Sequence, residues 1–477
     1  MAIILPANTI SDSGFSVDNS LRFDGSSAKL VKTNSSATST DDEKGTFSWW
    51  WKRGRTEETN YLLSQVNGQE RFLWYMISAG TFSGNYRASN GANDRDLALT
   101  GAPNFRDCTA WMHCVLAYDT SLATQLDRIR FYVNNVEYVV TQSGNVPQNT
   151  KFSPNKSSYG GDMEVFAQGT SNYHSGYLAE FCFVDGQRLT PSSFGEADED
   201  SPNIWKPKDI SSLAFGNMGY YLNFKDSSNL GNDVSANTED FTATNLAATD
   251  QCTDTPTNNF CTMNPLDNYY QGSTFSEGNT IIVTGSGSQA YNTSTIYVTS
   301  GKWYVEVKPT AGSATSMIGI AGELANGTDG NDVQLQYKTY GWCYKDDGNV
   351  FNNNTADSGT WASYTTNDII GIALDLDNNK LYFSKNGTWQ NSGDPTSGST
   401  GTGAVSVTAP ASTTIGAYAF AVNETWDDNT RTYSFNFGNP SFSISSGNAD
   451  GNGYGNFEYA PPSGYYSICS KNLAEYG

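Results

Sequence analysis

The chain has 477 residues, a charged fraction of only 16%, and a formal net charge of −22 from 49 acidic and 27 basic residues. Because such a charge repels a phosphate backbone and no basic stripe offsets it, the composition excludes a nucleic-acid-binding protein. No apolar run approaches the roughly 20 residues that a membrane-spanning helix needs, so membrane insertion is not expected.

Short alternations of polar and apolar residues dominate the chain, and apolar stripes with a helical period are missing. Aromatic residues are abundant (28 Tyr, 24 Phe and 11 Trp), and 46 glycines punctuate the alternating runs. A chain of this length is expected to hold two or three domains. The predicted fold class is all-β, with two tandem antiparallel β-sandwiches.

Residues 1–20 precede any core strand and are predicted to form an N-terminal arm. Their opening segment lacks the basic region and the cleavage site of a signal peptide. Ile3, Ile4 and Leu5 are apolar although no core strand is near, and a short strand can add to an exposed sheet edge. We therefore expect these three residues to dock on a neighbouring chain during assembly.

The first sandwich is predicted over residues 21–218. In its strand at 129–133, Ile129, Phe131 and Val133 share one face, and the residues between them point to the other. This alternation indicates a strand with one side in a core.

Several stretches of this region carry a resemblance to a known family. They read SLRFDGSSAKL, GTFSWWWKRG, WMHCVLAYDT followed by DRIRFYVNNVE, and SGYLAEFCFVDGQRLTPSSFGE. Together they resemble the laminin G-like, concanavalin A-like sandwich, in the version found in virion proteins of tailed phages, especially marine ones. The resemblance covers roughly residues 20–265.

Residues 219–268 are predicted to form an irregular extension and linker. FKDSSNLGNDVS and TDTPTNNFCTMNPL are similar to segments that recur in phage structural proteins. The Pro-containing stretch 255–268 lies between two complete sets of alternating strands, so the domain junction is expected between about 255 and 275.

The second sandwich is predicted over residues 269–446 and is organised around the stretch 368–389. Four aliphatic residues alternate along one face of its first strand: Ile370, Ile372, Leu374 and Leu376. Asn386-Gly387 is a strong signal for a tight hairpin. The stretch is therefore predicted to be an antiparallel meander that is buried on one side.

The order of the surrounding motifs resembles an SPRY domain. These motifs are GKWYVEVKP (301–309), MIGIAG (317–322), YGWCYKDDGNVFNNN (340–354), TIGAYAF (414–420) and TYSFNFGNP (432–440). The resemblance implies a two-layered sandwich that binds protein or other partners through its loops, with no catalytic residues to carry over. Residues 447–477 are predicted to form an ordered but irregular tail.

Catalytic arrangements find little support in the sequence. His113 and His174 adjoin predicted strands, so both are expected to have structural or surface roles. Glucanases share the concanavalin-like fold, but the acidic run at 196–200 lacks apolar alternation and is predicted to be a solvated loop. No catalytic residue is assigned, and the chain is predicted not to be an enzyme.

Metal and disulfide chemistry are not assigned either. Loop carboxylates such as Asp41, Asp96, Asp226 and Asp233 offer oxygens, but calcium needs about six to eight oxygen ligands that converge. No metal or cofactor is therefore assigned. The seven cysteines form no CxxC pair and are expected to be buried thiols, with a Cys252–Cys261 bridge left open.

Aromatic residues beside Asp, Asn and Gly mark the predicted recognition loops of the second sandwich. A saccharide site uses such an aromatic face together with hydrogen-bonding side chains. Trp303 and Trp342 are expected in the core, and Trp389 and Trp426 at the surface. The candidate ligand-binding residues are Tyr344, Asp346, Asp347, Trp389, Glu424, Trp426, Asp427 and Asp428.

The resemblances imply a non-enzymatic appendage protein on the exterior of a phage virion, of tail-fibre or receptor-binding type, that attaches to the host surface. Expected partners are a host cell-surface glycan or protein, other virion proteins and further copies of the chain, with a trimer favoured. Two alternatives stay open: a capsid decoration or tail connector protein, and a polysaccharide-degrading enzyme. Since the chain lacks heptads and collagen-like repeats, a trimer would form through sandwich faces or terminal segments.

Overall fold

The computed structural model describes the chain except for short gaps. The described residues are 14–56, 59–68, 70–87, 95–142, 146–152, 154, 161–268, 272–285, 290–312, 315–325, 334–424 and 430–477. The chain divides into two compact units between Asn258 and Asn259. Ile3, Ile4 and Leu5, expected to dock on a neighbouring chain, lie outside the described residues.

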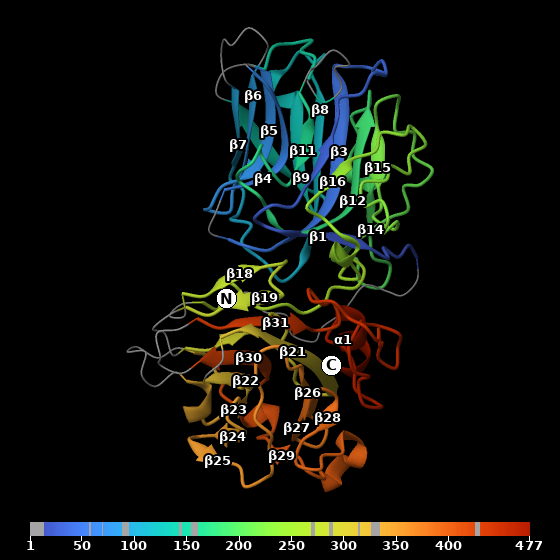
Figure 1. The fold of residues 1–477 in the computed structure, drawn as a ribbon. Helices are drawn as coiled ribbons and strands as arrows, with labels where there is room; N and C mark the ends of the chain where they lie inside the picture. The colour runs from blue at the N-terminus through green and yellow to red at the C-terminus, as the bar shows by residue number, and fades with distance from the viewer. Residues whose placement is uncertain are drawn as a thin grey trace. The chain divides into compact units, whose positions relative to one another are not determined.

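The first unit is a two-layered antiparallel sandwich (Figure 1). The front layer consists of β16 (Thr242–Thr244), β2 (Lys29–Lys32), β11 (Met163–Val165), β4 (Asn60–Asn67), β5 (Glu70–Met76), β6 (Phe82–Arg87) and β7 (Arg95–Thr100). The back layer consists of β9 (Ile129–Val133), β8 (Trp111–Asp119), β3 (Lys44–Arg53), β12 (Ser175–Asp185), β1 (Ser20–Asp24), β17 (Gln251–Cys252) and β15 (Tyr220–Leu222). β10 (Val136–Gln142) pairs with β7 at one end and with β9 at the other, so it joins the two layers.

Aromatic side chains from both layers fill the space between them. Trp74 of the front layer lies 4.8 Å from Phe131 of the back layer, between ring centroids. Along β9, Ile129, Phe131 and Val133 are buried and the two residues between them are only partly buried. The alternation predicted for this strand is confirmed, and it places one apolar face of each layer in a common core.

The outer face of the back layer is covered by other parts of the same unit. Phe194, Ile210 and Phe215 pack over Cys182 and its neighbours, in a cluster that follows the end of β12. A second cluster joins Val17 to the outward side of β3 and β8. A hairpin of β13 (Gly195–Ala197) and β14 (Trp205–Pro207) belongs to this covering region. The acidic run at 196–200 was expected to be solvated, but Asp198 is buried beside Lys206, which compensates its charge.

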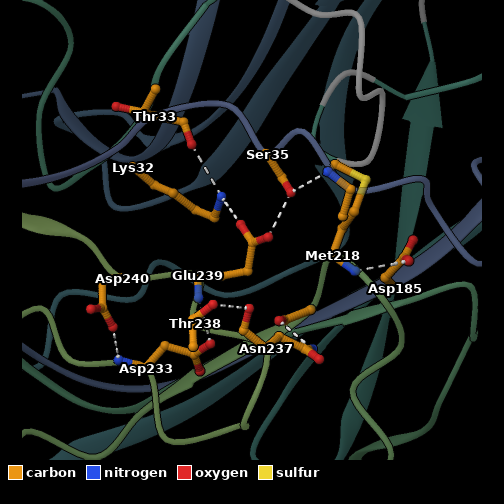
Figure 2. Close-up of polar contacts among 12 residues, drawn as sticks. Lys32, Thr33, Ser35, Asp185, Met218, Asp233, Asn237, Thr238, Glu239 and Asp240 are labelled. Atoms are coloured by element: carbon orange, nitrogen blue, oxygen red, sulfur yellow. Dashed lines mark hydrogen bonds and ion pairs between the residues drawn. The ribbon is translucent and has the colours of Figure 1, made fainter.

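Residues 219–258, expected as an extension, contribute β15, β16 and β17 to the first unit. Figure 2 shows how polar contacts fix this segment: Glu239 forms an ion pair with Lys32 and accepts a hydrogen bond from Ser35. Asp233 accepts the backbone N–H groups of Ser235 and Glu239, both at 2.9 Å. These contacts use the Asp233 oxygens to order the loop.

The second unit is also a two-layered antiparallel sandwich (Figure 1). One sheet consists of β18 (Thr274–Ser276), β19 (Ile281–Val283), β31 (Thr432–Asn436), β21 (Lys302–Ala311), β26 (Ile370–Asp375), β27 (Lys380–Lys385), β28 (Thr388–Trp389) and β29 (Val405–Ser406). The other consists of β20 (Asn292–Thr293), β30 (Ala419–Glu424), β22 (Ser316–Ala321), β23 (Gly341–Lys345), β24 (Asn349–Asn352) and β25 (Thr355–Ala356). Trp303 and Trp342 lie in the shared core, as predicted.

The predicted meander is β26–β27–β28. Ile370, Ile372 and Leu374 enter the core, and Asn386 and Gly387 adopt positive φ angles of 48° and 77° in the turn. The expectation that the meander is buried on one side only is wrong, because every residue of β26 is buried. The C-terminal tail supplies the second cover.

The tail covers the outer face of the β21–β26–β27 sheet. Phe457 and Tyr465 pack with Tyr304, Ala373 and Tyr382 in one apolar cluster. The chain then ends in the short helix α1 (Ser470–Tyr476). Across the described residues, no helix has the length and apolar character needed to cross a membrane. All seven cysteines are buried free thiols, so Cys252 and Cys261 are not bridged.

Candidate functional site

An open groove lies where the two sheets of the second sandwich part, between β24–β25 and β29. Its volume is about 500 Å³. Core residues Trp342, Val350 and Val405 contribute apolar surface to it. Phe351, Ala356 and Ala404 add to the apolar lining, and the polar lining residues are Asn352, Thr355, Asp357, Ser358 and Ser406. We call this feature the mouth groove.

Hydrogen bonds fix the polar side chains of the mouth groove. The Asp357 carboxylate accepts the backbone N–H of Gly359 at 2.8 Å and the indole N–H of Trp361 at 3.1 Å. The Asn352 amide donates to the carbonyl oxygens of Thr339 and Gly341, at 3.0 and 2.9 Å. These groups are therefore held in place before any ligand arrives, which lowers the entropic cost of binding.

Asn391 links the two walls of the groove. Its carbonyl oxygen accepts the backbone N–H of Thr360 at 3.0 Å, next to the wall formed by Asp357 and Ser358. Its amide donates to the carbonyl oxygen of Gly403 at 3.3 Å, next to the wall that begins at Ala404. One side chain thus fixes the separation of two segments that lie far apart in the sequence.

The predicted recognition residues occupy other places. Tyr344 is fully buried, its hydroxyl donates to the carbonyl oxygen of Ala362, and its ring contacts Tyr364 at 5.1 Å. Its ring is therefore a core element, which corrects its assignment as a ligand-binding residue. Glu424 is only 2% exposed, and its carboxylate accepts the Thr284 hydroxyl at 2.7 Å. That hydrogen bond makes it a buried structural carboxylate.

Two of the predicted acidic residues lie in the turn between β23 and β24. Burial raises the pKa of the partly buried Asp346. The exposed Asp347 forms an ion pair with Lys345 at 3.0 Å. Burial opposes ionisation of Asp347 as well, but hydrogen bonds from Asn349 and Lys345 lower its pKa below the ordinary value. Asp346 donates its backbone N–H to the carbonyl oxygen of Ser316. Ser316 lies opposite Glu424 in the pairing of β22 with β30, so these three residues meet at one end of β22.

Trp389 lies apart from them, on the outer face of the other sheet. It is partly buried and contacts Tyr304 and Tyr382 edge to face, at 6.4 and 6.5 Å between centroids. The prediction of a surface tryptophan therefore holds only in part. Trp426, Asp427 and Asp428 lie outside the described residues.

The mouth groove was not predicted from the sequence because its walls come from two segments that lie far apart along the chain, residues 350–358 and residues 404–406. The signal in the sequence was weak: a run of small polar residues, Asn352 to Asn354, and a second run of Gly, Ser and Thr near 400. Either run reads as an ordinary loop. Their meeting depends on the pairing of β29 with β27.

Comparisons with known proteins agree with the fold. The family model of the SPRY domain matches residues 301–411, which lie in the second sandwich. No curated protein matches the sequence.

Several solved structures share part of the architecture. The SPRY domain of human HERC1 is 19% identical and covers 36% of this chain and 96% of its own, with a TM-score of 0.27. A Ruminococcus gnavus sialidase module, CBM40, bound to α2,3-sialyllactose is 16% identical and covers 37% of this chain and 96% of its own, with the same TM-score. A heptameric pentraxin from Limulus polyphemus is 16% identical and covers 36% of this chain and 78% of its own, with a TM-score of 0.26. Likenesses at this level carry no argument about ligands.

Proposed function

We propose that the protein is a non-enzymatic binding protein whose mouth groove holds part of a host cell-surface glycan or protein. The observation that supports this proposal is that the mouth groove combines an apolar base with polar side chains that are already fixed by hydrogen bonds. An apolar surface gains free energy when a ligand displaces water, and fixed polar groups set the orientation of that ligand. Trp342 and Val405 supply the first property, and Asn352 and Asp357 supply the second.

The lining of the groove supports binding without catalysis. Among the described residues that line it, Asp357 is the sole carboxylate. Hydrolysis of a glycosidic bond by either common mechanism uses a pair of carboxyl groups on the two sides of the scissile bond. The Asp357 carboxylate moreover already accepts hydrogen bonds from Gly359 and Trp361. A recognition role fits this single anchored carboxylate better than general acid catalysis.

The biological setting is the finer part of the proposal. We place the protein on the exterior of a tailed-phage virion, as an oligomeric tail-fibre or receptor-binding component. What supports this is the sequence resemblance of residues 20–265 to laminin G-like virion proteins, together with the segment FKDSSNLGNDVS. A trimer that also contacts other virion proteins would present several mouth grooves at once, and linked sites bind far more tightly than single ones.

Binding by the mouth groove is tested on the full chain with a substitution that fills it. Ser406 is an exposed lining residue, so Ser406→Trp blocks the groove without touching the core. The matched control is Ser192→Trp, at an exposed position of the first sandwich. We expect the parent and the control to bind host cells and to block phage adsorption, and the Ser406→Trp chain to do neither. Equal binding by all three would place recognition elsewhere.

The virion location is tested separately by labelling particles with an antibody against the chain. Gold label on a distal appendage is the expected result in electron micrographs. Label spread over the shell or at the tail junction would favour a capsid decoration or a connector, and unlabelled particles would overturn the virion proposal.

A further inference from the structure

The two walls of the mouth groove are held in place by different means. The wall at 404–406 contains β29, which pairs with β27, and Val405 enters the core. In the described structure, the wall at 357–360 belongs to no strand. Trp361 anchors its far end in the core, but the wall itself depends on side chains from other parts of the chain.

One turn supplies these side chains to the irregular wall. Asn391 donates its backbone N–H to the carbonyl oxygen of Thr360 at 3.0 Å, and its side-chain oxygen accepts the N–H of Thr360 at 3.0 Å. The side-chain oxygen of Gln390 accepts the N–H of Ala362 at 3.1 Å. The remaining side-chain group of Asn391, its amide, donates to Gly403 beside the other wall. The two walls are therefore joined through one side chain.

Asn391 is packed between two glycines, one beside each wall. A Cβ atom on Gly359 would lie only 2.7 Å from Cγ and from Nδ2 of Asn391. A Cβ atom on Gly403, which has a φ of 67°, would clash with the Asn391 backbone and lie 2.6 Å from the Cα of Gly393. Both walls thus approach Asn391 as closely as glycine allows.

The turn that presents Asn391 has a strained backbone. Gly393 donates its backbone N–H to Gln390 at 2.9 Å, and the two central residues, Asn391 and Ser392, have φ angles of 53° and 54°. These are angles of a type I′ turn, whose central positions favour Asn and Gly. Ser392 instead places a Cβ atom in the left-handed region, which is unfavourable for an L-residue. Strain of this kind persists only where the surroundings impose it, and it clusters at functional sites.

We propose that Asn391 is the positioning residue of the mouth groove, and that its strained turn, residues 390–393, sets the separation of the two walls that the ligand requires. This inference rests on the proposed function, since it concerns the same site. Asp357 and Ser358 line the groove on the wall that Asn391 holds. A wall that is ordered beforehand spares the ligand the entropic cost of ordering it, so loosening the wall weakens binding.

The chain offers a matched pair of substitutions for the test. Asn391→Gly tolerates the left-handed turn and removes both side-chain links between the walls. The control is Asn386→Gly, because Asn386 also has a positive φ, of 48°, in a turn. Its side chain likewise joins two segments, accepting the N–H of Ile369 at 2.8 Å and donating to Asp368 at 2.7 Å. Asn386 is not among the residues that line the mouth groove.

The separation of the walls is measured on the full chain without a ligand. Spin labels are attached to the exposed positions Ser358→Cys and Ser406→Cys; the seven native cysteines are buried. The distance distribution should be narrow in the parent background and with Asn386→Gly, and broader or longer with Asn391→Gly. In the unlabelled chain, Asn391→Gly should speed hydrogen exchange at the Thr360 amide by roughly twofold to tenfold, the effect of one lost hydrogen bond. Unchanged distances and exchange would overturn the inference.

Binding to host cells then tests the role of this separation. Asn391→Gly should weaken binding by roughly threefold to tenfold, and Asn386→Gly should leave it unchanged. Ser392→Gly separates positioning from folding: it relieves the strain and frees the turn, so stability in urea should be kept or raised while binding weakens. Binding that falls only in step with stability would overturn the inference. So would undiminished binding of Asn391→Gly where Ser406→Trp abolishes binding, whereas undiminished binding of Ser406→Trp would overturn the proposed function itself.

Discussion

The Glu306 carboxylate accepts the backbone N–H of Tyr459 at 2.7 Å, across 153 residues of sequence. The same carboxylate accepts the backbone N–H of Glu458 and the side-chain amide of Asn436, both at 3.0 Å. Glu306 lies on β21 and is fully buried, and its burial raises its pKa. One side chain of the sheet thus fastens the tail that covers the sheet.

Removing this carboxylate should loosen the tail. Glu306→Ala leaves several donors without their acceptor, and each unsatisfied buried donor costs about 1–3 kcal/mol. We expect the free energy of unfolding in urea to fall by about 3 kcal/mol or more, and chymotrypsin to cut near Tyr459 faster. Glu475→Ala, at an exposed position of α1, is the control and should change little. A tail that stays protected in Glu306→Ala would contradict this role.

Glu180 should make stability depend on pH near neutrality. It lies at the bulge of β12 between Ala179 and Cys182, with a φ of 48°, and its carboxylate accepts the Tyr221 hydroxyl. Burial raises the pKa of Glu180 from 4.5 to about 7. The native state then keeps a proton that the unfolded state loses, so this group lowers the free energy of unfolding as pH rises from about 4.5 to about 7.

The contribution over that window is about 3 kcal/mol. Urea unfolding at pH 5, 6, 7 and 8 measures it as the difference between the parent and Glu180→Gln, which stays neutral and can still accept the Tyr221 hydroxyl. The substituted chain should gain stability relative to the parent as pH rises. Parallel pH profiles for the two chains would show that Glu180 is ionised in the folded protein below this range.

Removing one partner of the ion pair between Lys52 and Asp254 should lower the free energy of unfolding. Its atoms are 2.7 Å apart, and the two side chains are 1% and 0% exposed. Asp254 also accepts the indole N–H of Trp111 at 2.9 Å. Asp254→Ala removes the carboxylate that compensates a buried ammonium group and should cost about 3–5 kcal/mol in a urea titration. The double substitution Lys52→Met with Asp254→Leu should recover most of this loss; a double variant as unstable as the single one would argue against charge burial as the cause.

His113 should not titrate in the physiological range. Its Nδ1 accepts the indole N–H of Trp205 at 2.9 Å, so its Nε2 carries the proton and donates to the Ser48 hydroxyl at 2.8 Å. That polarity is the reverse of a catalytic serine–histidine pair, in which the histidine accepts the serine proton. Burial lowers the pKa of His113 to about 3. NMR shifts of its ring should therefore stay constant between pH 5 and 8, and a fluorophosphonate should not label Ser48.

The strand alternation could be predicted from the sequence because a half-buried strand repeats its chemistry every second residue. Ile129, Phe131 and Val133 show this period, and the structure buries all three. The same rule would have corrected one site residue. Tyr344 lies two positions after Trp342, so the two share a face, and a core Trp342 implies a core Tyr344. The neighbouring Asp346 and Asp347 suggested a surface loop instead.

Other features depend on contacts that no local pattern records. The second cover of β26 comes from Phe457 and Tyr465, in a segment without regular alternation. Asn391 joins the walls of the mouth groove through Thr360 and Gly403. In both cases the deciding contact joins segments whose local sequences are compatible with an ordinary surface loop.

The strand order of the first sandwich begins at β16 and ends at β17, and β10 closes the side between the two layers. β16 has three residues and β17 has two. Exposed strand edges are the templates along which proteins stick to one another, and very short edge strands deny a neighbour the backbone it would need. Copies of this sandwich can therefore be crowded at high local concentration without zippering into aggregates. That property is compatible with the oligomeric display proposed above.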